Sequence, residues 1–230
     1  MIDVAANWER IRERAAAAAR RAGRDPSTVR IVAVSKTKPV TLIAAAVAAG
    51  VTDLGENYVQ EAAEKIPEIT AAVTWHFVGH LQRNKAGRAV ELFDVIQTLD
   101  SVGLADALQR QAERRARTVR VLIEVNLAAE ASKSGVAPAA VEALVAAVGQ
   151  HRALQVDGLM AIPPPVSSAE AARPYFQALR ALRDRLLPTA PANAPLRDLS
   201  MGMSDDFEAA IEEGATMVRI GRAIFGERET

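Results

Sequence analysis

The chain has 230 residues, half of them apolar and 24% charged, a composition typical of a globular protein and not of a disordered or collagen-like chain. Lys plus Arg and Asp plus Glu both number 28. We therefore expect no overall field that draws the molecule to nucleic acid or to an anionic membrane, and neither is predicted as a partner. Cysteine is absent, which excludes disulfides, thiolate catalysis and cysteine-ligated metal sites.

The N-terminal stretch, residues 3–22, is predicted to form a helix, because alanine is abundant there and favours helices. Six arginines lie between residues 10 and 24, and Glu9 and Glu13 are interleaved with them. A solvated helix face is the simplest interpretation, and a basic arm that binds nucleic acid is the alternative. No stretch has the length of a membrane-spanning helix or the apolar core of a signal peptide, so we expect a cytoplasmic protein.

After this helix, short β-branched runs alternate with longer alanine-rich stretches, the pattern of a parallel sheet with helices between its strands. Strands are predicted at Arg30–Ser35, Thr52–Gly55, Thr74–Val78, Val95–Leu99, Val119–Asn126, Val156–Ile162, Asp198–Met201 and Met217–Ile220. Helices are predicted near 40–49, 57–66, 81–91, 102–117, 138–148, 168–186 and 204–213. The fold class is therefore α/β: a single (β/α)8 TIM-type barrel over residues 1–230 with an extra N-terminal helix, or alternatively an open doubly wound sheet.

Boundary residues support the predicted helices. Gly50 and Gly214 each follow an apolar-periodic stretch, as glycines that end helices do. Pro138 lies where a first helical turn tolerates proline, and Ser167 has the spacing of a capping box with Glu170.

Lys36 is the first candidate for chemistry. Strand alternation places Val32, Val34 and Lys36 on one face, at the end where barrel enzymes carry their active sites. Only five of the 28 basic residues are lysines, so the sequence uses arginine where positive charge alone suffices. A desolvated lysine amine is a nucleophile toward carbonyl groups, whereas a rim lysine that contacts solvent or a carboxylate is the equally weighted alternative.

Arg219 lies among apolar residues in the last predicted strand and shares a face with Met217. A buried guanidinium needs an acceptor. That acceptor is either a buried carboxylate or part of a ligand, such as a heteroaromatic nitrogen.

The loops after the last two strands are rich in small residues. Ser204 precedes a predicted helix, and Gly221 with Arg222 opens a short final turn. Backbone N–H groups at such positions bind anions, and barrels often hold phosphate there, so a phosphate site is predicted. A helix cap for Ser204 and a tight turn for Gly221 are the simpler readings.

Two further motifs carry weaker signals. Asn57 follows the second strand and can reach the barrel mouth, although capping a turn or helix is its commoner role. His76 and His80 are four residues apart but span a strand and a loop, so we expect no metal site.

Six segments in chain order closely resemble the pyridoxal phosphate homeostasis protein family. They are VAVSKTKP at residues 32–39, GENYVQE at 55–61, WHFVGHLQRNK at 75–85, GLM at 158–160, LSMGMS at 199–204 and VRIG at 218–221. The resemblance implies a single (β/α)8 barrel like the N-terminal domain of alanine racemase. It also implies that this barrel binds pyridoxal 5′-phosphate as a Schiff base on Lys36. It also implies Arg219 near the pyridine nitrogen, Ser204, Gly221 and the next backbone N–H around the phosphate, and Asn57 and Ser200 nearby.

One position departs from the family pattern. Residue 222 is Arg, where many members carry a small hydroxyl residue. Its backbone N–H can still bind phosphate, while its guanidinium either compensates for the lost hydroxyl or points into solvent.

The resemblance further implies a role in vitamin B6 homeostasis, in which the protein buffers or delivers pyridoxal phosphate and so affects amino-acid balance. We expect a monomeric carrier and not an enzyme, with enzymes that lack their pyridoxal phosphate as acceptors. Reactions on amino acids need a second proton donor or acceptor, which the racemases draw from another domain and subunit, whereas this chain ends just after the predicted barrel. A slow amino-acid racemase is the alternative.

Overall fold

The computed structural model describes residues 2–128 and 134–227. Eight parallel strands form a closed barrel in which each strand pairs with the next along the chain and the last pairs with the first. They are β1 (Arg30–Val34), β2 (Asp53–Glu56), β3 (Thr74–Phe77), β4 (Val95–Leu99), β5 (Val119–Glu124), β6 (Leu154–Met160), β7 (Asp198–Ser200) and β8 (Met217–Ile220). The barrel prediction is confirmed and the open sheet is excluded, because no strand of the ring is left with an unpaired edge.

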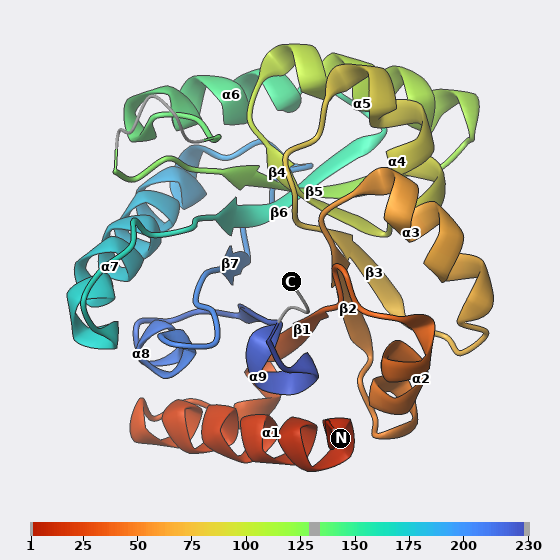
Figure 1. The fold of residues 1–230 in the computed structure, drawn as a ribbon. Helices are drawn as coiled ribbons and strands as arrows, with labels where there is room; N and C mark the ends of the chain where they lie inside the picture. Colours follow the sequence, from red (N-terminus) through yellow and green to blue (C-terminus); the bar gives the residue numbers. More distant parts are fainter. Residues whose placement is uncertain (1, 129–133, 228–230) are drawn as a thin grey trace.

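Helices surround this barrel on the outside (Figure 1). They are α1 (Val4–Arg21), α2 (Val40–Ala48), α3 (Val59–Lys65), α4 (Ala86–Leu92), α5 (Val102–Arg114), α6 (Val141–Val148), α7 (Ala169–Leu186), α8 (Phe207–Glu212) and α9 (Arg222–Phe225). The predicted extra helix, α1, lies across the outside of the barrel beside α8, α9 and α2.

Helix boundaries follow the predictions with four corrections. Gly50 and Gly214 end their helices with φ of +98° and +103°, as expected. The N-cap of α7 is Ser168 and not Ser167, because it is the Ser168 hydroxyl that accepts the Ala171 N–H at 3.2 Å.

Two predicted helices start later than expected, since the stretch 81–91 opens with a 3-10 turn and the stretch 204–213 opens with a turn before Phe207. The same delay is seen in the stretch 138–148, where Pro138 begins a 3-10 turn that leads into α6.

Two arginines of the first helix, Arg14 and Arg21, have partners on α8. Arg14 pairs with Glu208 of α8 at 3.2 Å and lies over the Phe207 ring, and Arg21 pairs with Glu212 at 2.8 Å.

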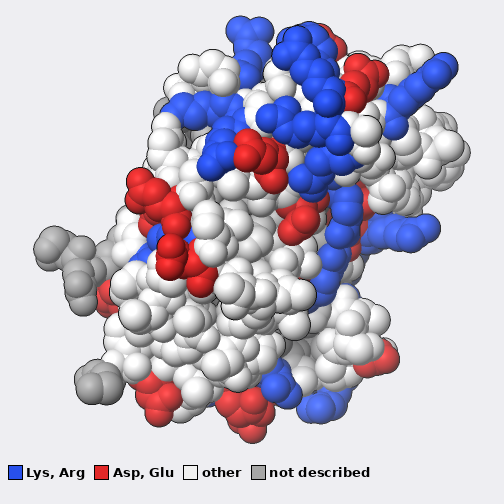
Figure 2. All heavy atoms as spheres, turned by 90° about the vertical axis from the view of Figure 1, so that its right-hand side faces the viewer, with Lys and Arg blue, Asp and Glu red and all other residues white. Residues whose placement is uncertain are grey.

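Figure 2 shows Lys and Arg gathered on the upper part of one side, with Asp and Glu among them and a broad uncharged area below. In the part of the chain that the structure describes, no helix is both long and apolar enough to cross a bilayer.

The apolar core has two parts. A large cluster fills the layer between strands and helices, and a small one inside the barrel consists of Val32, Val95, Leu122, Met160 and Met217. The small cluster takes one side chain from each of five strands. It therefore identifies the inward face of those strands, on which every second residue belongs.

Candidate functional site at the barrel mouth

Lys36 lies two residues beyond the end of β1, in a turn that the Lys38 N–H closes by bonding to the Ser35 carbonyl at 3.1 Å. The strand is thus one residue shorter than predicted. The inward placement of Lys36 is nevertheless confirmed, because Val32 belongs to the interior cluster and Lys36 lines the cavity at the mouth together with Val34.

The turn that carries Lys36 is held rigidly. Thr37 has a φ of +63°, which is costly for a β-branched residue and needs support from its surroundings. Its N–H bonds to a Glu61 carboxylate oxygen at 2.5 Å, and the Lys65 amine donates to the Ser35 carbonyl at 2.8 Å. Two side chains of α3 therefore hold the backbone on both sides of Lys36 in place.

Behind this turn lies a buried charge cluster that sequence reasoning missed. The Lys65 amine is 2.9 Å from a Glu56 oxygen and 2.5 Å from a Glu61 oxygen, and the Ser35 hydroxyl donates to Glu56 at 2.7 Å. Burial raises the pKa of Glu56, although the bonds from Ser35 and Lys65 oppose the shift. The scarcity of lysine was the available signal, since Lys65 is one of only five.

Arg219 points into the barrel as predicted and is only 5% exposed. Its Nη1 donates to the Ser200 hydroxyl at 2.7 Å and its Nη2 to the Ala161 carbonyl at 2.9 Å. No carboxylate of residues 2–128 or 134–227 lies within ion-pair distance, so the buried-carboxylate alternative does not apply to the described chain. Burial lowers the pKa of Arg219 to about 10, opposed by the more distant charges of Glu124 and Asp206.

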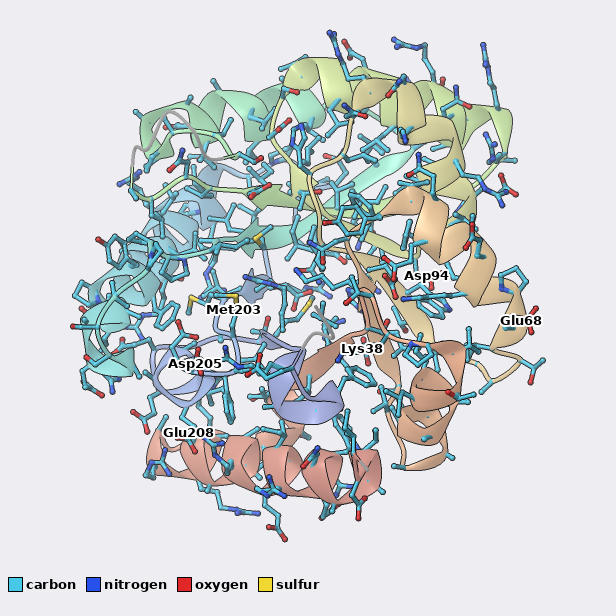
Figure 3. All side chains as sticks on the ribbon, in the orientation of Figure 1. Lys38, Glu68, Asp94, Met203, Asp205 and Glu208 are labelled. Carbon is cyan, nitrogen blue, oxygen red and sulfur yellow. The ribbon has the colours of Figure 1, made fainter. Side chains whose placement is uncertain are left out.

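One cavity of about 290 Å³ collects most of the predicted residues. Its lining contains Lys36, Asn57, Ser204, Arg219, Gly221 and Arg222, along with apolar side chains of the mouth. A second cavity of about 410 Å³ shares Lys36, Gly221 and Arg222 with it. Figure 3 shows Met203 and Asp205 on one side of α9 and Lys38 on the other.

Ser200 is the predicted residue that lies apart from this cavity. It is completely buried behind Arg219, where its hydroxyl accepts from the guanidinium and donates to Gln97 Oε1 at 2.6 Å. Its contacts are with the arginine that would meet a ligand, and not with the cavity itself.

Asn57 reaches the mouth because the chain packs tightly beneath it. A Cβ at Gly79 would lie 2.2 Å from the Asn57 carbonyl oxygen, so only glycine allows this approach. The N-cap of α3 is Tyr58, so Asn57 does not cap that helix. Its buried Oδ1 has no hydrogen-bond partner among the residues that the structure describes. An acceptor left unpaired is costly and marks a place for a donor from a ligand.

The loops after β7 and β8 meet at the start of α9. The Ser204 hydroxyl accepts the Ala223 N–H at 3.3 Å and does not cap α8, whose N-cap is Asp206. Arg222 is half-exposed and bonds Asp205 at 2.5 Å and Glu227 at 3.2 Å. Its guanidinium is therefore occupied by carboxylates at the cavity rim.

Glu124, also missed from the sequence, is a buried acid at the end of β5. It lies two residues after Leu122 on the inward face and is 7% exposed. Its Oε2 lacks a hydrogen-bond partner in the described chain. Burial raises the pKa of Glu124 to about 7, against the attraction of Arg219.

The two histidines are separated as expected. His76 is buried inside the barrel between Asp53 and Gln97, whereas the His80 side chain is 57% exposed and lies near Ser134 and Asp100.

A larger cavity, of about 710 Å³, lies elsewhere. It opens between α1 and the starts of β1 and β2, at the opposite end of the barrel, and none of the predicted site residues lines it. We place the site at the mouth because the reactive groups converge there.

Comparisons with known proteins identify the family. Residues 4–229 match the family described as alanine racemase, N-terminal domain. The pyridoxal phosphate homeostasis proteins of Pseudomonas aeruginosa and Escherichia coli K12 are 45% and 43% identical to this chain, covering all of it and 97% and 98% of their own lengths. This chain belongs to the pyridoxal phosphate homeostasis protein family.

Solved structures extend the comparison. PipY of Synechococcus elongatus, solved with pyridoxal phosphate bound, is 39% identical with a TM-score of 0.83, covering 94% of this chain and 100% of that one. An alanine racemase from Corynebacterium glutamicum has a TM-score of 0.67 at 17% identity, which shows the shared barrel alone. The match covers 96% of this chain but 61% of the racemase.

Proposed function

We propose that this protein binds pyridoxal phosphate reversibly at the barrel mouth, attached to Lys36, and buffers or delivers it inside the cell. The observation that carries the proposal is the convergence of a primary amine, a buried arginine and anion-binding groups on one cavity. The names of the full-length relatives and the bound form of PipY support it.

The residues at the mouth fit this group. Pyridoxal phosphate supplies an aldehyde that condenses reversibly with a primary amine, with loss of water, together with a pyridine ring and a phosphate. Lys36 offers the amine, and Arg219 still has N–H donors for a ring nitrogen, because two of its five N–H groups make the contacts described above. The unpaired Oδ1 of Asn57 is available to a ligand donor.

The phosphate would lie by Ser204, Gly221 and Arg222. The first intrahelical bond of α9 is from the Ile224 N–H to the Gly221 carbonyl, so the preceding N–H groups have no partner within the helix. Lys38 and Arg219 add positive charge around the two adjoining cavities, whereas Arg222 is paired with Asp205 and Glu227. Together with the Ser204 hydroxyl, these groups favour an anion.

A carrier role agrees with the position of Arg219. A guanidinium that donates to the ring nitrogen disfavours protonation of that nitrogen, and an unprotonated ring withdraws electrons less strongly. Turnover of amino acids would be slow under these conditions.

Covalent trapping tests the proposal. The protein is incubated with pyridoxal phosphate, reduced with borohydride and mapped by peptide mass spectrometry. We expect the label on Lys36 and its loss in Lys36→Ala. Lys38→Ala is the matched control, because the Lys38 amine lies on the adjoining cavity but bonds to the Glu227 carbonyl at 2.5 Å. Label on Lys38 or Lys85 in place of Lys36 would reject the site.

A slow racemase is the second candidate, favoured by Glu124. In an eight-strand barrel β5 lies opposite β1, so this buried acid ends the strand across the barrel from the one that leads to Lys36. Interconversion of L- and D-alanine that is lost in both Lys36→Ala and Glu124→Gln would establish this activity. Absence of interconversion in protein that is loaded with pyridoxal phosphate would leave the carrier role.

Delivery to other enzymes is tested by transfer. Loaded protein is mixed with an enzyme stripped of its pyridoxal phosphate, and recovery of that enzyme's activity is followed over time. Transfer faster than spontaneous release into solution would support delivery, and equal rates would reduce the role to buffering. We expect the loaded protein to be a monomer by sedimentation.

A further inference from the structure

A chain of buried polar side chains crosses the inside of the barrel and ends at Arg219. Its members are Asp53, His76, Gln97 and Ser200, from β2, β3, β4 and β7, and we call them the polar relay. His76, Gln97 and Ser200 have no exposed surface, and Asp53 is 8% exposed at the opposite end of the barrel from the mouth.

Each link has the length of a hydrogen bond. Arg219 Nη1 lies 2.7 Å from Ser200 Oγ, which lies 2.6 Å from Gln97 Oε1. Gln97 Nε2 lies 2.9 Å from His76 Nδ1, and His76 Nε2 lies 2.9 Å from Asp53 Oδ1. The other Asp53 oxygen accepts from the Thr52 hydroxyl at 2.8 Å.

The groups at the two ends of the relay, the Arg219 guanidinium and the Asp53 carboxylate, determine which atom donates in each hydrogen bond. A guanidinium only donates, so Ser200 Oγ accepts from it and sends its own proton to Gln97. The Gln97 amide then donates to His76 Nδ1, which leaves the histidine proton on Nε2, facing the carboxylate of Asp53. With the amide reversed, the histidine would present an acceptor to that carboxylate, which only accepts when ionised.

The relay connects the buried cation through hydrogen bonds to a carboxylate at the far end of the barrel. Hydrogen bonds aligned in one direction polarise one another, so the carboxylate of Asp53 strengthens the acceptor that holds Arg219. A carboxylate in direct contact would instead occupy the guanidinium donors. Since the partners of Arg219 are a hydroxyl and a carbonyl, donors remain for a ligand in the cavity.

We propose that Asp53, His76, Gln97 and Ser200 are positioning residues, which orient the Arg219 guanidinium so that it donates to the ring nitrogen of pyridoxal phosphate. The proposal rests on the proposed function, because it concerns how that ligand is recognised. It assigns a role to four side chains that do not line the cavity at the mouth.

The test compares two ligands: pyridoxal phosphate and its carbocyclic analogue, in which CH replaces the ring nitrogen. The wild-type protein should bind pyridoxal phosphate roughly tenfold more tightly, the value of one hydrogen bond to a charged group. His76→Phe keeps an aromatic ring but breaks the relay, and most of this preference should disappear. Asp53→Asn should lose a smaller part, because its amide oxygen still accepts the His76 proton although the charge is gone.

Asp198→Asn is the matched control. Asp198 is a buried carboxylate at the start of β7 that bonds Arg30 at 2.5 Å and Thr216 at 2.9 Å, outside the relay. The ratio of the two affinities should equal the wild-type ratio in this variant. Because the ratio is measured within each folded variant, a general loss of stability does not change it.

A wild-type ratio retained in both His76→Phe and Asp53→Asn would overturn the proposal, as would an equal loss in Asp198→Asn. Equal binding of the two ligands by the wild-type protein would also overturn the proposal, because Arg219 would then make no favourable hydrogen bond to the ring nitrogen. Failure of the wild-type protein to bind either ligand would instead reject the proposed function.

Discussion

The inside of the barrel and the layer between strands and helices differ in polarity. The outer layer is apolar almost throughout and holds every phenylalanine of the chain: Phe77, Phe93, Phe176, Phe207 and Phe225. The interior has only a small apolar cluster, and around it lie buried polar groups that each need a partner. Burying polar groups costs free energy, so the outer layer supplies stability and the interior is organised for the site.

The largest effect on stability is expected in the outer layer. Phe93 is fully buried and meets Phe77 edge to face, with 5.1 Å between ring centroids. Phe93→Ala should lower the free energy of unfolding by about 3–5 kcal/mol through lost contacts and a cavity. Urea denaturation would measure it. The affinity of the folded fraction for pyridoxal phosphate should not change, and a large change would mean that the two regions are coupled.

The buried Glu124 should make the stability of the protein depend on pH. The unfolded chain releases this proton near pH 4.5 and the folded chain near pH 7, so stability should fall as pH rises between these values. Glu124→Gln should therefore be more stable than wild type above pH 7, by up to about 3 kcal/mol, and equal to it below pH 4.5.

Denaturation at several pH values would measure this difference, with the exposed Glu68→Gln as a control that should follow the wild-type curve. A constant difference between Glu124→Gln and wild type at all pH values would contradict the raised pKa of Glu124.

Gly79→Ala tests the close contact between Gly79 and the Asn57 backbone at the barrel mouth. The new Cβ would overlap the Asn57 backbone, whose displacement should cost about 1–3 kcal/mol of stability. Binding of pyridoxal phosphate should weaken as well, because Asn57 lines the cavity. Gly23→Ala, with no atom within 4 Å of its new Cβ but a φ of +67°, provides a strained variant away from the site. Weaker binding in both would point to a general effect.

The smallest effect is expected at the rim. Arg222 has a 48% exposed side chain, and its pairs with Asp205 and Glu227 are screened by solvent. Arg222→Ser, which replaces the guanidinium with a small hydroxyl, should change stability by less than about 1 kcal/mol. Calorimetry at low and high salt would measure affinity for pyridoxal phosphate. A large loss that salt does not affect would show that the guanidinium binds the ligand directly.

Local pattern predicted much of this architecture. Alternation between β-branched runs and helical stretches predicted all eight strands, and Met217–Ile220 has the predicted bounds. Strand ends were less accurate: β1 stops at Val34 and β6 begins at Leu154, because strand length depends on pairing with neighbours. The inward placement of Lys36 and Arg219 followed from side-chain alternation, a local property of the backbone.

The sequence by itself thus determined the alternation of strands and helices, the inward face of the first and last strands and the residues that end at the mouth, since these depend on periodicities of two to four residues. Closure of the sheet into a barrel followed from the pairing of the last strand with the first. Only the tertiary structure decided which interior polar groups meet. Ser200 and Gln97 are 103 residues apart in the chain, and closure of the barrel brings them to 2.6 Å. The partners of Arg219, the support of Lys36 from α3 and the burial of Glu124 arise in the same way, from contacts between strands and helices that no local pattern records.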